Sequence, residues 1–135
     1  MAQRHAFIKQ ITREALAPAQ ASGHKESHVH KEPHILVIDD EDSIAGMVAD
    51  ALRDEGDTVT VAYDGRQGLE LAQKQPPDLI ITDVMMPYMD GIKMAELLHR
   101  QLATATPPIV FMSAVDCRQQ VQMYGGFLAK PFTLD

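Results

Sequence analysis

Continuous apolar runs alternate along the chain with segments whose apolar residues recur every three or four positions. The runs cover residues 35–38, 79–81 and 109–112, and each follows shortly after a proline. They are rich in β-branched residues and have the length of strands, which is typical of strands that are covered on both faces. Residues 58–61 alternate between Thr and Val, as in a half-covered edge strand, and residues 127–129 form a short last run.

Helical periodicity separates these predicted strands. The strongest repeat falls at positions i, i+3, i+4, i+7 and i+8, in Ile44, Met47, Val48, Ala51 and Leu52, and weaker repeats involve Leu69 with Ala72 and Ile92, Ala95, Leu98 and Leu102. Parallel strands need crossover connections, and those connections are right-handed. The order of the elements therefore predicts an α/β, doubly wound fold with a five-stranded parallel sheet and helices on both faces.

The first 34 residues differ in composition from the rest of the chain. They contain five Lys or Arg against three Asp or Glu, and five of the six histidines lie before residue 35. Within residues 4–16 an amphipathic helix is predicted from its apolar stripe of Phe7, Ile8, Ile11 and Ala15, which Pro18 ends. Residues 18–34 are interpreted as a linker. Its histidines at 24, 28, 30 and 34 have spacings that allow zinc or nickel chelation, although a solvated His-rich linker is the preferred interpretation.

Composition and charge narrow the class of protein. The chain has 135 residues with 45% hydrophobic content, enough for one ordinary domain with a real core. Its formal net charge of -7 argues against a general nucleic-acid binder. The single cysteine, Cys117, fits a reducing compartment, and no apolar run is long enough to span a bilayer. We expect a soluble, cytoplasmic protein with no membrane contact.

The predicted strands end in polar residues with related chemistry. Asp39 and Asp40 follow the first continuous run, Asp83 follows the second and Ser113 follows the third. In open parallel sheets, ligands bind beyond the carboxyl ends of the strands. Three carboxylates gathered there would repel one another without a cation, and hard oxygen ligands suit Mg²⁺. Lys130, after the last run, would add a fixed positive charge to a site suited to phosphoryl transfer.

Four blocks of sequence carry a family resemblance. Their order and spacing resemble those of the signature blocks of response-regulator receiver domains. The blocks are residues 37–41, 83–91, 112–114 and 130–132. The resemblance covers roughly residues 34–135, so that residues 35–135 are expected to form the receiver domain, after an amphipathic helix and linker in residues 1–34. It implies a flavodoxin-like sheet with strand order 2-1-3-4-5.

The resemblance also implies a metal site and a phosphoacceptor. Asp83 is similar by position to the aspartate that attacks the phosphoryl group of a phosphohistidine. The resemblance implies that Mg²⁺ is bound directly by Asp40, Asp83 and the backbone carbonyl of Met85. Asp39 is implied to act through water. Ser113 and Lys130 match the positions that bind phosphoryl oxygens.

The position of Phe127 resembles the aromatic switch of the family. In receiver domains this ring moves inward when the hydroxyl at the position of Ser113 is drawn to the phosphate. The family resemblance thus implies a switch of conformation that a partner detects.

The chain departs from the family pattern in two places. The stretch from Ala114 to Lys130 is short, so the fourth helix, around residues 116–123, is expected to be stunted. The chain stops at Asp135, where a fifth helix would only begin, and the loss of that helix would expose an apolar face. Truncation of a longer protein is the preferred explanation. A helix supplied by a dimeric partner and docking of residues 4–16 in its place are the alternatives.

The resulting hypothesis is a receiver module of a two-component phosphorelay. A histidine kinase or phosphotransfer protein would donate the phosphoryl group, and a downstream protein or a missing output domain would read the result. The chain would not be an enzyme in the usual sense, but a phosphoacceptor with slow self-dephosphorylation, because the apolar Met85 and Val115 cannot orient an attacking water. A phosphorylation-independent binding module is the first alternative. A Mg²⁺-dependent phosphatase of the haloacid-dehalogenase type is the second alternative. It needs a second acid two positions after a nucleophile on the first strand, where Asp39 is followed by Asp40 and Glu41, and the sequence has no substrate-capping insertion.

Overall fold

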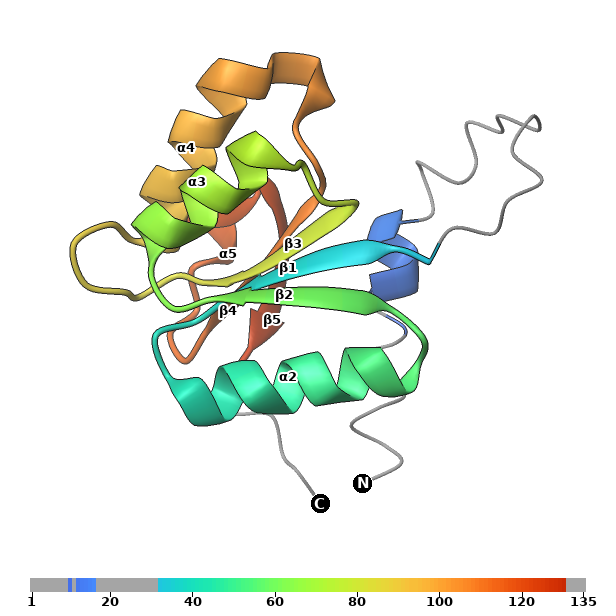
Figure 1. The fold of residues 1–135 in the computed structure, drawn as a ribbon. Helices are drawn as coiled ribbons and strands as arrows, with labels where there is room; N and C mark the ends of the chain where they lie inside the picture. The colour runs from blue at the N-terminus through green and yellow to red at the C-terminus, as the bar shows by residue number, and fades with distance from the viewer. Residues whose placement is uncertain (1–9, 11, 17–31, 131–135) are drawn as a thin grey trace.

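Five parallel strands form a single sheet in the order β2-β1-β3-β4-β5 (Figure 1). The computed structural model describes residue 10 and residues 12–16 and 32–130. The strands are β1 (His34–Ile38), β2 (Thr58–Ala62), β3 (Leu79–Asp83), β4 (Ile109–Ser113) and β5 (Gly125–Ala129). This order and direction confirm the doubly wound fold predicted from the sequence.

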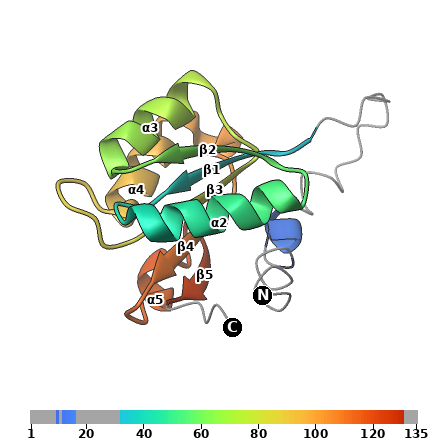
Figure 2. The same ribbon diagram turned by 60° about the horizontal axis from the view of Figure 1, so that its bottom comes forward.

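Helices cover both faces of this sheet. They are α2 (Asp42–Asp54), α3 (Gly65–Lys74), α4 (Gly91–Leu102) and α5 (Arg118–Val121), with a 3₁₀ turn at Ala103–Ala105. Figures 1 and 2 show α3 and α4 side by side on one face and α2 on the other. None of the helices among the described residues is long and apolar enough to cross a membrane.

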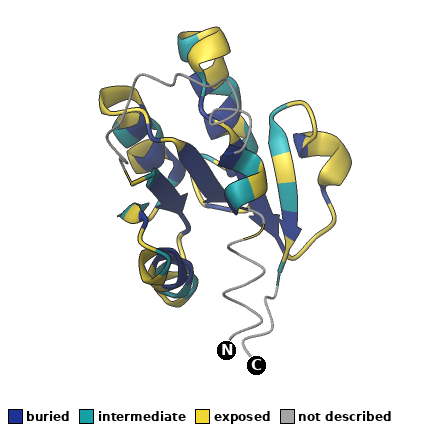
Figure 3. Cartoon of the chain, turned by 90° about the vertical axis from the view of Figure 1, so that its right-hand side faces the viewer, coloured by how far each residue is buried: buried dark blue, intermediate teal, exposed yellow. Residues whose placement is uncertain are grey.

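Two apolar clusters hold the layers together, one on each face of the sheet. Leu36, Ile80 and Phe111 pack toward α3 and α4, whereas Val37 and Val110 pack toward α2. Alternate residues of a strand point to opposite faces, so a continuous apolar run serves both clusters. Every residue of β3 and β4 is buried, and Figure 3 shows these strands in dark blue between partly exposed helices.

Local signals fix where two of the helices begin. The side chain of Asp64 accepts a hydrogen bond from the backbone N–H of Gln67, and the side chain of Asp90 accepts one from Lys93. Each aspartate therefore caps the amino end of its helix and satisfies an N–H that has no partner within the helix. The cap at Asp90 also fixes the end of the loop that follows β3.

The fourth predicted helix is stunted, as its short stretch of sequence indicates. Helix α5 has only four residues, Arg118–Val121, and Val121 is its one buried residue. The fifth helix would begin in residues 131–135, which lie outside the described residues, and so do Phe7, Ile8 and Ile11 of the N-terminal stripe. Residues 12–16 are helical, which agrees with the predicted end of the amphipathic helix before Pro18.

Candidate functional site

Three aspartates meet at the edge of the sheet where β1 and β3 end. Asp39 and Asp40 directly follow β1, and Asp83 is the last residue of β3. Because neighbouring parallel strands end at the same edge, residues that are far apart in sequence become neighbours there. One carboxylate oxygen from each residue lies within 4.8 Å of the others. Asp39 and Asp83 are buried, with 0% and 4% of their surface exposed, whereas Asp40 is open to solvent.

Lys130 supplies a positive charge to the two buried carboxylates. It follows β5, and its backbone N–H donates to the carbonyl of Ser113 at the end of β4. Its Nζ lies 2.9 Å from Oδ2 of Asp39 and 3.2 Å from Oδ1 of Asp83. A buried charge is costly unless it is paired, so Lys130 partly compensates both carboxylates. One lysine against three aspartates still leaves the site with an excess of negative charge.

The electrostatic environment changes the proton affinity of these groups. Burial and, after it, the charge of Asp39 raise the pKa of Asp83, Lys130 opposes both effects, and together they move the pKa from 3.8 to about 6. Burial by itself would lower the pKa of Lys130, but its hydrogen bond to Asp39 and the charges of Asp39 and Asp83 outweigh burial and raise that pKa above 10.5. Lys130 therefore stays charged at neutral pH. The surroundings of Asp83, by contrast, disfavour its ionised form.

The donor set fits a magnesium ion. All three side chains offer carboxylate oxygens, which are the hard ligands that Mg²⁺ prefers. The exposed position of Asp40 leaves room for the water molecules that this ion usually retains. The raised pKa of Asp83 indicates that the cluster gains from additional positive charge. Met85, the fourth ligand implied by the sequence, lies in the loop after β3 with its side chain exposed.

Ser113 lies on β4, which is next to β3, and Phe127 lies on β5, the edge strand beyond β4. Ser113 ends β4 and is buried, and its Oγ accepts a hydrogen bond from the backbone N–H of Val115. Phe127 is half-buried in β5, pairs in register with Phe111 and packs against the cluster under α3 and α4. The guanidinium of Arg118 lies 5.0 Å from the centre of its ring, within the range of a cation–π contact. Sequence reasoning did not identify Arg118, because no local pattern links it to Phe127.

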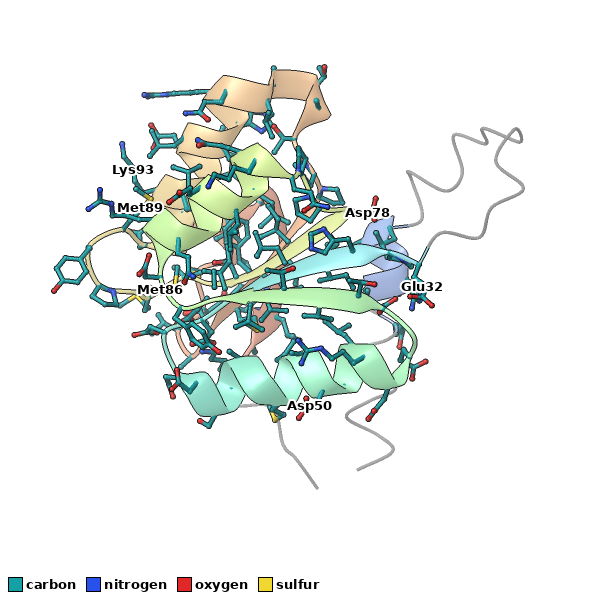
Figure 4. All side chains as sticks on the ribbon, in the orientation of Figure 1. Glu32, Asp50, Asp78, Met86, Met89 and Lys93 are labelled. Carbon is teal, nitrogen blue, oxygen red and sulfur yellow. The ribbon has the colours of Figure 1, made fainter. Side chains whose placement is uncertain are left out.

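The loop after β3 is held close to the acidic residues by a glycine. A Cβ atom on Gly91 would lie 2.2 Å from the carbonyl oxygen of Asp83, so the backbone approaches there as only glycine allows. The N–H of Gly91 donates to the carbonyl of Val84 and closes the loop. Figure 4 shows Met86 and Met89 of this loop at the opposite end of the sheet from Glu32 and Asp78. The sequence block of residues 83–91 does not by itself indicate this close contact.

Comparison with known proteins agrees with this arrangement. A family model of the response regulator receiver domain matches residues 35–135. The chain belongs to this family. Receiver domains of this family act in two-component signalling, and the family match and the strand order decide against the phosphatase alternative.

Curated relatives of this receiver domain are longer proteins. It is 37% identical over 108 residues to the probable transcriptional regulatory protein TcrX of Mycobacterium tuberculosis, covering 75% of this chain and 44% of the relative. It is 34% identical over 108 residues to the DNA-binding dual master transcriptional regulator RpaA of Synechocystis, covering 76% and 45%. The chain therefore spans less than half the length of these two relatives.

Solved structures share the receiver fold. The chemotaxis response regulator CheY4 of Vibrio cholerae is 36% identical, with a TM-score of 0.70, over 76% of this chain and 89% of that one. The receiver domain of the Francisella response regulator 1452 is 33% identical, with a TM-score of 0.69, over 76% and 87%. These likenesses confirm the flavodoxin-like strand order that the sequence resemblance implied.

Proposed function

We propose that this receiver domain accepts a phosphoryl group on Asp83 from the phosphohistidine of a histidine kinase or a phosphotransfer protein. The single observation that carries the proposal is the contact of Lys130 with both Asp39 and Asp83 at the open edge of the sheet. This contact joins a carboxylate nucleophile to a fixed cation, in a cluster whose oxygen atoms can also hold a metal ion. Phosphoryl transfer depends mainly on such positioning and on the neutralisation of oxygen charge.

In the proposed step, an oxygen of Asp83 attacks the phosphorus atom while the bond from phosphorus to the histidine nitrogen breaks. The product is an acyl phosphate, and the released imidazole keeps the electron pair of the broken bond and takes a proton from solvent. Lys130 keeps Asp83 charged by its ion pair and then pairs with a phosphoryl oxygen. The hydroxyl of Ser113 donates to another phosphoryl oxygen.

A Mg²⁺ ion would be held directly by Asp40, Asp83 and the backbone carbonyl of Met85. Asp39 would act on it through a water molecule. When bound, the ion neutralises charge on the phosphoryl oxygens. The chain's own contribution is to bury Asp39 and Asp83 side by side, so that their oxygen atoms are gathered where a divalent cation would neutralise their charge.

The output of this domain is proposed to be a contact with another protein or a further domain of a longer chain. Phosphorylation would draw Ser113 toward the phosphate and let Phe127 move inward, which shifts the balance between two conformations. The relatives are named as transcriptional regulators, but the acidic charge of this chain opposes direct contact with nucleic acid. We infer a cytoplasmic location from the proposed partners and from the single reduced cysteine.

The proposal is tested by intact mass after incubation with acetyl phosphate and Mg²⁺. One added phosphoryl group is expected in the parent chain and none in Asp83→Asn. Asp90→Asn is the matched control, since it changes an aspartate at the end of the loop that follows Asp83, and asparagine also caps helices well. It should gain the group like the parent. No gain of mass in the folded parent would refute the proposal and favour the phosphorylation-independent binding module.

A further inference from the structure

The face of the sheet that carries α2 receives a second element from the start of the chain. Leu16 is only 2% exposed and belongs to the same cluster as Val37, Val110 and Leu128, and Ala15 packs against that cluster. Val110 and Leu128 lie on β4 and β5, whereas α2 packs mainly against β2 and β1. Figures 1 and 2 show this segment, residues 12–16, in blue near the end of the sheet where β1 begins.

A charged contact fixes the same segment to the loop before β2. Nη2 of Arg13 lies 2.9 Å from Oδ1 of Asp57, whose side chain is 1% exposed. The other oxygen, Oδ2, has no hydrogen-bond partner among the described residues. Without Arg13 the buried carboxylate would lose its compensating charge. One apolar anchor and one charged anchor therefore hold residues 12–16 in place.

The segment also forms one wall of a groove that reaches the far edge of the sheet. Glu14 and Ala15 line this groove of about 460 Å³ together with Val110 and Gly126. A Cβ atom on Gly126 would meet nothing within 4 Å, so the groove is open above β5. Residues 12–16 thus lie between the loop before β2 and the start of β5.

We propose that residues 12–16 dock in cis on this face and cover the start of β4 and β5 from the N-terminal side. Residues 17–33 connect Leu16 to β1. At about 3.3 Å per extended residue, such a connection reaches farther than the roughly 30 Å diameter of a small domain. The segment of the same chain is therefore always within reach, which gives it a high effective concentration over one from a second copy.

The docking lies away from the phosphoacceptor site. Arg13 and Ala15 contact the loop before β2 and the start of β4 and β5, whereas Asp83 lies at the opposite, carboxyl end of the strands. The inference consequently does not depend on the proposed function. Gain of mass from acetyl phosphate and docking of the segment can each fail alone.

Thermal unfolding of the full chain tests the apolar anchor. Leu16→Ala is expected to lower the melting temperature by roughly 10 °C, as for other buried leucines, and Leu16→Asp by more. Gln10→Ala is the matched control, because Gln10 is exposed and lies six residues earlier in the chain, and it should change the melting temperature by no more than about 2 °C. If Leu16→Ala has the same melting temperature as the Gln10→Ala control, the docking is refuted.

The charged anchor and the cis arrangement need two further measurements. Arg13→Gln should lower the melting temperature, and adding Asp57→Asn should then cost little more, because the two residues form one contact. Strictly additive losses of melting temperature would contradict a direct contact between Arg13 and Asp57.

Light scattering after size exclusion should give a monomer at all concentrations. A dimer that Leu16→Asp dissociates would overturn the cis docking and show that a second copy supplies the segment.

Discussion

Replacement of Asp83 by Asn should stabilise the metal-free protein at neutral pH, although it removes the proposed phosphoacceptor. The charged form of Asp83 is disfavoured by burial and by Asp39, and its pKa is raised to about 6. Asparagine has nearly the same shape and carries no charge to bury. Lys130 keeps its ion pair with Asp39 in the variant, so no new unpaired cation is created.

The magnitude follows from the difference between the two pKa values. Raising the pKa from 3.8 to about 6 corresponds to roughly 3 kcal/mol of folding free energy once Asp83 is ionised. Water at the open edge of the sheet screens part of this, so we expect a gain of about 1–3 kcal/mol. A folded-state pKa above the unfolded value means that the protonated group stabilises the fold below pH 3.8. That stabilisation is lost as the pH rises through 6.

Urea unfolding with a chelator present, followed at several pH values, measures the effect. The parent and Asp83→Asn should have similar stability near pH 4 and diverge between pH 4 and 6, with a constant difference above pH 7. Saturating Mg²⁺ should then stabilise the parent by about 2.7 kcal/mol at one hundred times its dissociation constant, and the variant much less. A variant that is no more stable than the parent at pH 8, or equally more stable at pH 4, would refute this electrostatic account.

Three further predictions concern other parts of the molecule. Met85→Asn should shorten the lifetime of the phosphorylated protein several-fold, because an amide next to the acyl phosphate can orient water; an unchanged decay of the added mass would contradict slow self-dephosphorylation. Gly91→Ala should destabilise the protein by roughly 1–3 kcal/mol in urea, because its methyl group meets the Asp83 carbonyl. Gly46→Ala is its matched control and should stabilise α2 by about 0.5–1 kcal/mol, since nothing lies within 4 Å of the new atom. Phe111→Ala should cost about 3–5 kcal/mol, and a loss below 1 kcal/mol would show that the core near β4 is looser than its burial indicates.

Most of the fold could be predicted because its signals are local. Buried strands are continuous apolar runs, so the runs at residues 35–38 and 109–112 lie within β1 and β4. The helical repeat from Ile44 to Leu52 lies within α2. The start of β5 was missed, because two glycines do not look like a strand. Gly125 belongs there since its backbone approaches the carbonyl of Ile109, where a Cβ atom would lie 1.9 Å away.

The carboxylate cluster could also be predicted, because parallel strands bring their carboxyl ends to one edge. Asp39, Asp40 and Asp83 meet there as expected, and Lys130 joins them. Contacts between distant segments could not be predicted in the same way. The pairing of Arg13 with Asp57 depends on where the N-terminal segment packs, and neither residue has a sequence pattern that indicates a partner 44 positions away. Their chemistry permits many other ion pairs.

The four-residue length of α5 has a consequence for the dynamics of the molecule. A single turn of helix is far below the length at which helices persist on their own, and α5 is retained by its one buried residue, Val121. The free energy of local unfolding should therefore be much lower for α5 than for the strands beside it. Amide hydrogens of α5 should exchange early, well before those of β3. Because Arg118 leaves the ring of Phe127 whenever α5 opens, the edge strand β5 would be released on one side while the rest of the sheet stays folded.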